Sequence, residues 1–427
     1  MNPHQNEVKL LADISERMKA EQLTRQQLVT SKTNIKVTDD EVDSVPRLIY
    51  NHALTKTDLR SLSGLGQKHF VQSLENAQNA GVIGDPIYNN ITHLYTRHHV
   101  EALLNFWEKP TYRDTYKPRV VGIENQKGGI GKSTTTLMLA TASALDLSPS
   151  SYAKVLVLEV DPQATNGRGM INSELVDDET IFVTLIDLIL GPFETSGIYQ
   201  DLIAQGLSDE DIIRQSAMST HLPNLFVQPA FSNDGRFTRV FFEADKATQQ
   251  KIISRMSQTI IPALKKDYDL IYIDTPPQDS PLVWVVNDAV EFLIIPVTPK
   301  AFDFDSTVEY ASSTAERFKQ LPSQGKNLLW FRFLITNHDS NSQTEMGIKN
   351  KLTRTARDRL MSLACPRSEV VAHAADIGRS IFDVSKKEVK DKKICSAKKY
   401  DEVIFAMRAV YEQIIGEIRS LSVKDAE

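Results

Sequence analysis

Residues 125–136 read Asn-Gln-Lys-Gly-Gly-Ile-Gly-Lys-Ser-Thr-Thr-Thr, and this stretch decides how the rest of the chain is interpreted. An apolar run at 120–123 precedes it and a helical pattern at 137–145 follows it, so the order strand, glycine loop, helix is expected. Glycines let backbone N–H groups turn toward a phosphate, and the helix N-terminus behind them favours negative charge. The spacing predicts that Lys132 reaches the β- and γ-phosphates of a nucleotide and that the Ser133 hydroxyl holds Mg²⁺.

This loop differs from the usual P-loop at its beginning. The usual pattern has a glycine five residues before the last glycine of the loop, and here that position holds Gln126. Instead, Gly128 and Gly129 follow an additional lysine, Lys127. A glycine-rich turn without a ligand would leave two lysines in one tight loop without a role, so nucleotide binding is the preferred interpretation.

Length and composition narrow the class of protein. The 427 residues are enough for two or three domains, and 41% hydrophobic and 24% charged residues are ordinary for a globular chain. The net charge of −6 gives no overall attraction to nucleic acid, so DNA binding requires a local basic surface. Cys365 and Cys395 are too few for a disulfide framework and are expected to be reduced. The polar N-terminus is not typical of a signal peptide, and no apolar run approaches the roughly 20 residues of a membrane span.

The first 45 residues are predicted to form a helix and a linker. Val8, Leu11, Ile14 and Met18 recur at spacings of three and four residues, which places them on one helix face. Two interpretations stay open for this face: packing on its own domain, or a dimer contact.

Residues 46–108 are predicted to be a small winged helix-turn-helix module that binds DNA. A helix start near residue 55, a turn at Ser63-Gly64 and a second helix over 67–80 give the order helix, short turn, helix. Residues 82–95 are suited to a β-wing. The second helix would present polar side chains to a major groove, with Lys68 and Gln72 as the main candidates beside Gln67 and Asn76. The alternative is a helical hairpin without DNA contacts.

Residues 109–118 are a charged connector with two prolines, and the pattern changes after it. From 119 to 427, strand-like and helix-like runs alternate, which predicts an α/β domain with a mostly parallel sheet and helices on both faces. Strands are predicted at 120–124, 154–160, 225–229, 269–274, 291–297 and 328–336. Helical patterns include 246–266, 302–320 and 344–361.

Two acidic side chains end apolar strands of this predicted sheet. Val155–Val160 leads into Asp161, and Leu270–Ile273 leads into Asp274. Ligands of such sheets bind at the carboxyl ends of the strands, so both carboxylates are expected beside the glycine loop. Asp274 is in the position that holds Mg²⁺, and Asp161 is a candidate for orienting the attacking water. The alternative for either residue is a helix cap.

These motifs together resemble the partition-type ATPases of the ParA and MinD group, whose loop is a deviant Walker A motif. The resemblance covers residues 119 to about 420. It is carried by the loop at 127–134, Val-Asp-Pro-Gln at 160–163, Asp-Thr-Pro-Pro at 274–277 and Ile-Pro-Val-Thr-Pro at 295–299. The module at 46–108 and Tyr112-Arg113-Asp114 after it are similar to the larger ParA proteins, which have an N-terminal winged helix-turn-helix.

The resemblance implies an ATPase that uses ATP and Mg²⁺ and releases ADP. It assigns catalytic roles to Lys127, Lys132 and Asp161, with Lys127 reaching the phosphates of the partner subunit in an ATP-bound homodimer. It places Mg²⁺ on Ser133 and Asp274, and it implies that the following residues contact the nucleotide: Lys127, Gly128, Gly129, Gly131, Lys132, Ser133, Thr134 and, at the adenine, Asn337. Switch segments are expected at Asp161 and at 275–281. Glu159 replaces an aspartate found in many relatives and keeps its charge.

The resemblance also implies partners and a cellular place. The ATP-bound dimer is expected to bind DNA non-specifically, with possible higher-order assembly on it. A ParB-like centromere-binding protein is expected to stimulate hydrolysis, and the ADP form to repress its own operator. Candidate phosphate-binding residues are the basic stretch at 386–399, above all Lys392 and Lys393, and five basic residues at 349–359; the alternative is a solvated surface. A cytoplasmic, nucleoid-associated protein without membrane contact is expected.

Other classes remain as competing interpretations. One is a nucleotide-switched repressor that acts mainly through the module at 46–108. Another is a MinD-like membrane ATPase, which the polar tail after Leu421 disfavours. A nitrogenase-type iron protein would require cluster cysteines, which the chain lacks.

Overall fold

The computed structural model describes residues 14–18, 41–42, 45–46, 51–89, 92–161, 170–171 and 182–424. Most of the predicted N-terminal helix and the Pro-Gln part of the motif at 160–163 lie outside these residues. Ile14 and Met18, which are described, are both exposed.

A seven-stranded sheet forms the centre of the α/β domain, and its strands lie in the order β12-β11-β6-β10-β7-β9-β8. Six strands are parallel, and the short edge strand β8 is antiparallel to β9. The prediction of a mostly parallel sheet is confirmed, whereas β8 was missed because it has only two residues. The bounds are β6 (Arg119–Ile123), β7 (Val155–Glu159), β8 (Met218–Ser219), β9 (Leu225–Gln228), β10 (Leu270–Asp274), β11 (Phe292–Val297) and β12 (Trp330–Ile335).

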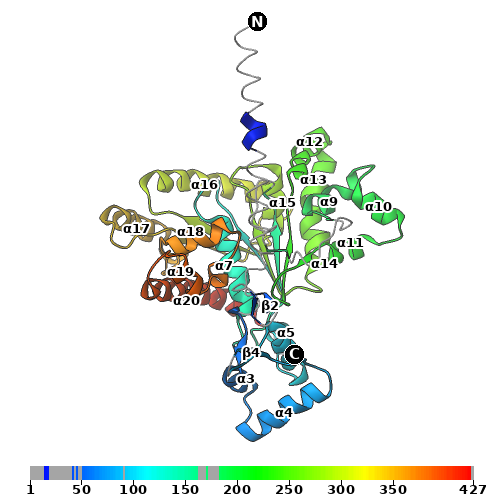
Figure 1. The fold of residues 1–427 in the computed structure, drawn as a ribbon. Helices are drawn as coiled ribbons and strands as arrows, with labels where there is room; N and C mark the ends of the chain where they lie inside the picture. The colour runs from blue at the N-terminus through cyan, green and yellow to red at the C-terminus, as the bar shows by residue number, and fades with distance from the viewer. Residues whose placement is uncertain are drawn as a thin grey trace.

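Helices cover both faces of the sheet, as expected for continuously apolar strands (Figure 1). Successive residues of a strand point to opposite faces of the sheet, so Val120 belongs to one buried cluster and Val121 to the other. The first cluster includes α9 (Leu185–Leu190), α12 (Arg236–Glu243), α13 (Lys246–Arg255), α14 (Ile261–Leu264), α15 (Pro281–Ala289), α16 (Ala301–Gln320) and α17 (Gln343–Ala356). The second includes α7 (Lys132–Leu145), α18 (Glu369–Asp376), α19 (Lys386–Asp391) and α20 (Ala397–Ser420).

Two predicted helices differ in detail from those observed. The run predicted at 246–266 is α13, a π-helical turn at Met256–Ile260 and α14 in succession. The helix predicted over 344–361 ends at Ala356, because Arg357 adopts a φ of 50° and a 3-10 turn follows over Arg357–Arg359. Arg357 and Arg359 therefore do not continue the helical face of Lys349 and Arg354, and that part of the prediction was wrong.

The N-terminal module has its own small core at one end of the molecule (Figure 1). Its elements are β3 (Leu54–Thr55), α3 (Lys56–Ser63), α4 (Gln67–Asn79), β4 (Ile87–Asn89), β5 (Thr92–Tyr95) and α5 (Arg97–Phe106), and β3, β5 and β4 form an antiparallel sheet. Thr55 caps α3 and Gly64, with a φ of 69°, ends it. Leu147 and Tyr152, which follow α7, pack against this core and join it to the α/β domain.

Candidate functional site

The glycine loop connects β6 to α7, as the sequence predicts. Gly129 and Gly131 have φ values of 74° and 86°, a region that side chains with a Cβ rarely adopt. A Cβ built at Gly128 or Gly129 would meet no atom within 4 Å, so this side of the loop faces open space. The loop is fixed from outside by the Thr336 hydroxyl at the end of β12, which donates to the Ile130 carbonyl at 2.7 Å.

The Lys132 ammonium bends back over this loop and donates to the Lys127 carbonyl at 2.9 Å. Lys132 is the first residue of α7 and is buried. Burial lowers its pKa, while Asp274 and Asp161 counteract that shift. A buried cation beside a glycine loop that opens a helix is suited to binding an anion.

A buried carboxylate lies beside this lysine. β10 pairs with both β6 and β7, so Asp274 lies level with Ile123 on one side and Glu159 on the other. Burial raises the pKa of Asp274 to about 6, although hydrogen bonding to Ser133 and the charge of Lys132 lower it. The Thr136 hydroxyl also approaches Asp274 Oδ1 at 3.4 Å. A carboxylate and a hydroxyl held together in this way are oxygen ligands of the kind that Mg²⁺ binds.

Asp161 follows β7, on the other side of β10 from the loop. Its charge acts on both Lys132 and Asp274, so the structure brings the three side chains together. The assignment of Asp161 as a water-orienting residue stays a prediction.

Lys127 does not point over its own loop. Its ammonium is ion-paired with Asp303 in the first turn of α16 and lies 4.4 Å from the centre of the Phe302 ring. Asp303 is buried and also accepts a hydrogen bond from Thr298, whereas the Phe302 side chain is 75% exposed. The sequence analysis did not identify Asp303. Its position as the third residue of a helix that follows an apolar strand could have indicated it.

Sequence reasoning also missed a buried charge network under the loop. Glu124, directly after β6, accepts a hydrogen bond at 3.0 Å from Arg317 of α16, and Asn287 and Tyr310 also donate to it. Arg317 also contacts Asp279 at 2.5 Å, in the segment after β10 where the second switch is predicted. Burial raises the pKa of Glu124, against the attraction of Arg317. The network connects the loop, the predicted switch and α16.

Asn337 is the second residue after β12 and has a φ of 51°, and its side-chain oxygen accepts a hydrogen bond from Arg367 at 3.3 Å. The residue before it, Thr336, contacts the glycine loop, and Asn337 itself is exposed. Its contact with an adenine stays a prediction.

The residues of this site fit a nucleoside triphosphate with Mg²⁺. The glycine loop has an open side, and Lys132 provides a cation. The Asp274 carboxyl is buried and its pKa is raised, and a divalent cation bound there would lower that pKa again. Gly128, Gly129, Gly131, Lys132, Ser133 and Thr134 would hold the phosphates, and Ser133 and Asp274 the ion. Bound Mg²⁺ would neutralise phosphate charge during transfer.

The candidate DNA-binding residues lie on two separate surfaces. Lys68 and Gln72 are exposed on α4, and Gln72 hydrogen-bonds to Asn76 at 3.2 Å. Lys392 and Lys393 are exposed just after α19, where Lys392 is ion-paired with Glu388 at 2.7 Å. Lys386 is paired with Asp401, and Lys398 and Lys399 lie within 4.0 Å of Glu402. The basic stretch at 386–399 is therefore partly neutralised.

Comparison with known proteins finds a matching family model and several relatives by sequence. Residues 118–321 match the family described as AAA domain. A putative replication protein A of Rhizobium rhizogenes is 24% identical over 316 residues, which cover 71% of this chain and 70% of that protein. Plasmid partition protein A of Escherichia coli is 25% identical over 235 residues, which cover 53% of this chain and about half (54%) of that protein.

A solved structure of a partition protein has the same fold. It is 20% identical, with a TM-score of 0.58, and the match covers 81% of this chain and 93% of that one. The fold and the sequence relatives together support a partition ATPase. Within the described residues, no helix is long and apolar enough to cross a membrane.

Proposed function

We propose that this chain is an ATP- and Mg²⁺-dependent partition ATPase that segregates a replicon by cycling on and off DNA. The observation that carries the proposal is the convergence of Lys132, Ser133 and Asp274 at the carboxyl ends of β6 and β10. Lys132 would hold the β- and γ-phosphates, and Asp161 would orient the attacking water.

The proposal includes an ATP-dependent homodimer in which Lys127 acts in trans. A cation supplied by the partner makes hydrolysis depend on assembly, since charge on the transferred phosphoryl group needs stabilisation. Two features near Lys127 support a face that a partner covers. Phe302 and Val308 on α16 are 75% and 57% exposed, and apolar side chains of this size favour burial.

The DNA activities are assigned to the two basic surfaces. The module at 51–106 has the order helix, turn, helix, hairpin, which supports a winged helix-turn-helix that reads an operator through Lys68 and Gln72. Lys392, Lys393 and neighbouring basic residues would bind phosphates of any DNA in the ATP state. A ParB-like protein would stimulate hydrolysis, and the ADP form would repress transcription at the operator.

A nucleotide-switched repressor is the second candidate, favoured by the exposed polar face of α4. Turnover in the presence of DNA separates the two, because a repressor needs no DNA-stimulated hydrolysis. The central test is Lys132→Ala, with exposed Lys326→Ala as control. ATP binding measured by calorimetry and phosphate release should both be lost in the first variant and kept in the second. Unchanged ATP affinity in Lys132→Ala would refute the assignment of the site.

A further inference from the structure

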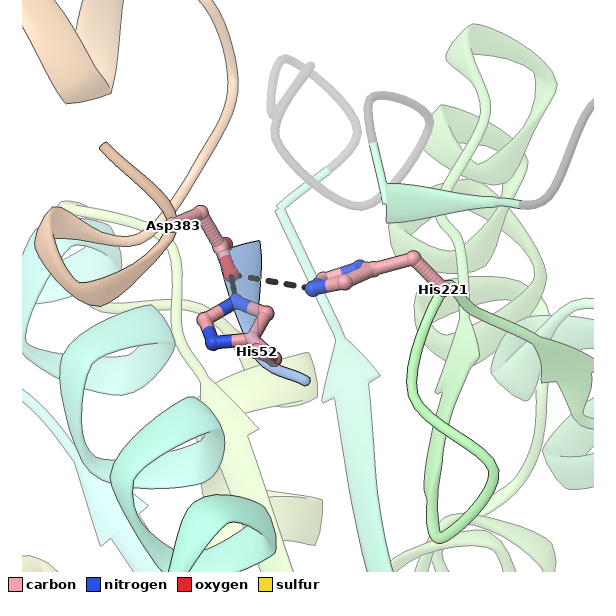
Figure 2. Close-up of side chains that lie close together, drawn as sticks. All are labelled: His52, His221 and Asp383. Atoms are coloured by element: carbon pink, nitrogen blue, oxygen red, sulfur yellow. Dashed lines mark hydrogen bonds and ion pairs between the residues drawn. The ribbon is translucent and has the colours of Figure 1, made fainter. Parts of the chain in front are cut away.

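Three side chains from distant parts of the sequence converge at the junction between the N-terminal module and the ATPase domain. Figure 2 shows His52, His221 and Asp383 with both imidazole rings directed at one carboxylate. The Nε2 atoms of His52 and His221 each lie 2.9 Å from the same atom, Asp383 Oδ1. Within the part of the chain that the structure describes, this is the one group of three such side chains whose donor atoms could hold a metal ion.

Local structure directs each donor to this point. His52 lies just before β3 of the module, and His221 lies in the connection between β8 and β9. Asp383 ends the short turn Ile381–Asp383, and its other oxygen, Oδ2, accepts the backbone N–H of Ser380 at 3.1 Å. That bond fixes the carboxylate plane, so Oδ1 remains directed at the two rings.

We propose that His52, His221 and Asp383 bind a divalent transition-metal ion, Zn²⁺, that fastens the N-terminal module to the ATPase domain. Two imidazole nitrogens and one carboxylate oxygen are a donor set that suits Zn²⁺, whereas Mg²⁺ and Ca²⁺ select oxygen ligands. The three donor atoms lie within 4.8 Å of one another, close enough to share one ion. Water would complete the fourth position.

Burial favours an ion over hydrogen bonds alone. The side chains of His52, His221 and Asp383 are only 7%, 10% and 4% exposed. A carboxylate in such a desolvated place is stabilised by a neighbouring cation, and a metal ion would supply that charge directly.

The position of the cluster indicates a structural role. α7 runs from the glycine loop toward the opposite edge of the sheet, where Arg97 of the module donates to the Leu145 carbonyl at 2.9 Å. His221 precedes β9 at this same edge, because β9 is parallel to the other central strands. The ion would therefore be remote from the nucleotide and would set how the module is held. This inference does not depend on the proposed function.

The test uses the full chain, purified without a polyhistidine tag and freed of metal with a chelator. Zn²⁺ is titrated in competition with a chromophoric chelator, and about one tightly bound ion per chain is expected. His52→Gln and His221→Gln keep a side-chain N–H that can donate to Asp383, so they should fold. Both should lose more than the roughly 10- to 100-fold in affinity that loss of an outer-shell partner costs. His98→Ala, an exposed histidine of the same module, is the control and should bind as wild type.

Hydrogen exchange locates the ion independently of the variants. Zn²⁺ should slow exchange at backbone amides near β3 and at 380–384 in the wild type and leave the glycine loop unchanged. Co²⁺ should give the visible absorption bands of a tetrahedral nitrogen–oxygen site in the wild type. This measurement needs no variant, so it tests the site even if the variants fail to fold. Absence of a tight ion in the wild type, or wild-type affinity in both glutamine variants, would overturn the proposal and leave a hydrogen-bonded contact between the two parts.

Discussion

The Lys127 ammonium is ion-paired with Asp303 of its own chain, so the lysine expected to act in the partner subunit is held in cis. Asp303 is fixed by the hydrogen bond from Thr298, and Phe302 covers one side of the lysine. Lys127 must leave this contact before it can reach another subunit. Asp303 would therefore keep the monomer inactive until ATP and a partner compete for the lysine.

Asp303→Asn should weaken this hold while keeping a side chain of the same shape. We expect the ATP-bound dimer to form at about fivefold lower protein concentration, which corresponds to about 1 kcal/mol. Turnover at low protein concentration should rise accordingly. Sedimentation velocity with ATP measures the first effect and phosphate release the second. Asp305→Asn, on an exposed position of the same helix, is the control. Weaker dimerisation in Asp303→Asn would show that the pair does not restrain Lys127.

The Arg317–Glu124 pair predicts a large loss of stability when one partner is removed. Both side chains are buried, at 7% and 2% exposure. Arg317→Met should lower the free energy of unfolding by about 3–5 kcal/mol, because it leaves the Glu124 charge buried without its cation. Arg317→Met combined with Glu124→Gln should recover most of that loss. Urea denaturation of the single and double variants measures the coupling.

The control for this cycle lies on the same helix. Lys319 and Glu316 form an ion pair at 2.6 Å, but their side chains are 69% and 62% exposed. Coupling there should stay within about 1 kcal/mol, since water screens the pair. Equal coupling in the two pairs would contradict the assignment of a desolvated network beneath the glycine loop.

The raised pKa of Asp274 predicts how stability depends on pH without metal. The folded chain retains the proton of Asp274 up to a pH of about 6, whereas the unfolded chain loses it near its usual value of 3.8. The folded state therefore binds more protons between these values, and the free energy of unfolding should fall as pH rises through them. Compared with Asp274→Asn, the wild type should lose up to about 1.4 kcal/mol per pH unit from about pH 4 to about pH 6.

Chemical denaturation in EDTA at several pH values measures this difference, because other titrating groups cancel between the two proteins. Mg²⁺ with ATP should stabilise the wild type above pH 6, whereas Asp274→Asn should not be stabilised in this way. Parallel pH profiles for the two proteins would show that Asp274 titrates normally.

The sequence allowed the sheet to be predicted because buried parallel strands are recognisable one at a time. Val155–Leu158 and Leu270–Ile273 are continuously apolar and end in acidic residues, so their carboxyl ends could be placed beside the loop before any contact was known. The partners of the loop could not be predicted in this way. Asp303 and Arg317 reach it from α16, more than 170 residues away in sequence, and only the packing of that helix brings them there. The same holds for His52, His221 and Asp383, which share no motif.

The last prediction concerns two DNA-binding surfaces that differ in what they recognise. Substitutions test these surfaces better than deletion of the N-terminal module. Arg97 and His52 of the module contact the ATPase domain, so a deletion would expose the surface of that domain which the module covers. Lys68→Ala or Gln72→Ala on α4 should change the preference for an operator sequence. Neither should alter ATP-dependent binding to unrelated DNA, because a base contact discriminates sequence whereas a phosphate contact does not.

Lys392→Glu with Lys393→Glu should have the opposite effect. Non-specific binding should weaken uniformly, and the log–log dependence of affinity on salt should flatten by roughly 0.9 for each DNA phosphate that the variant no longer neutralises. Because Lys392 is already paired with Glu388, Lys393 should account for most of the change. Lys246→Glu with Lys251→Glu on α13, across the sheet, makes the same change in charge at exposed positions and is the control. If both double variants weakened binding equally, net charge alone would explain the affinity for DNA, and the stretch at 386–399 would be an ordinary solvated surface.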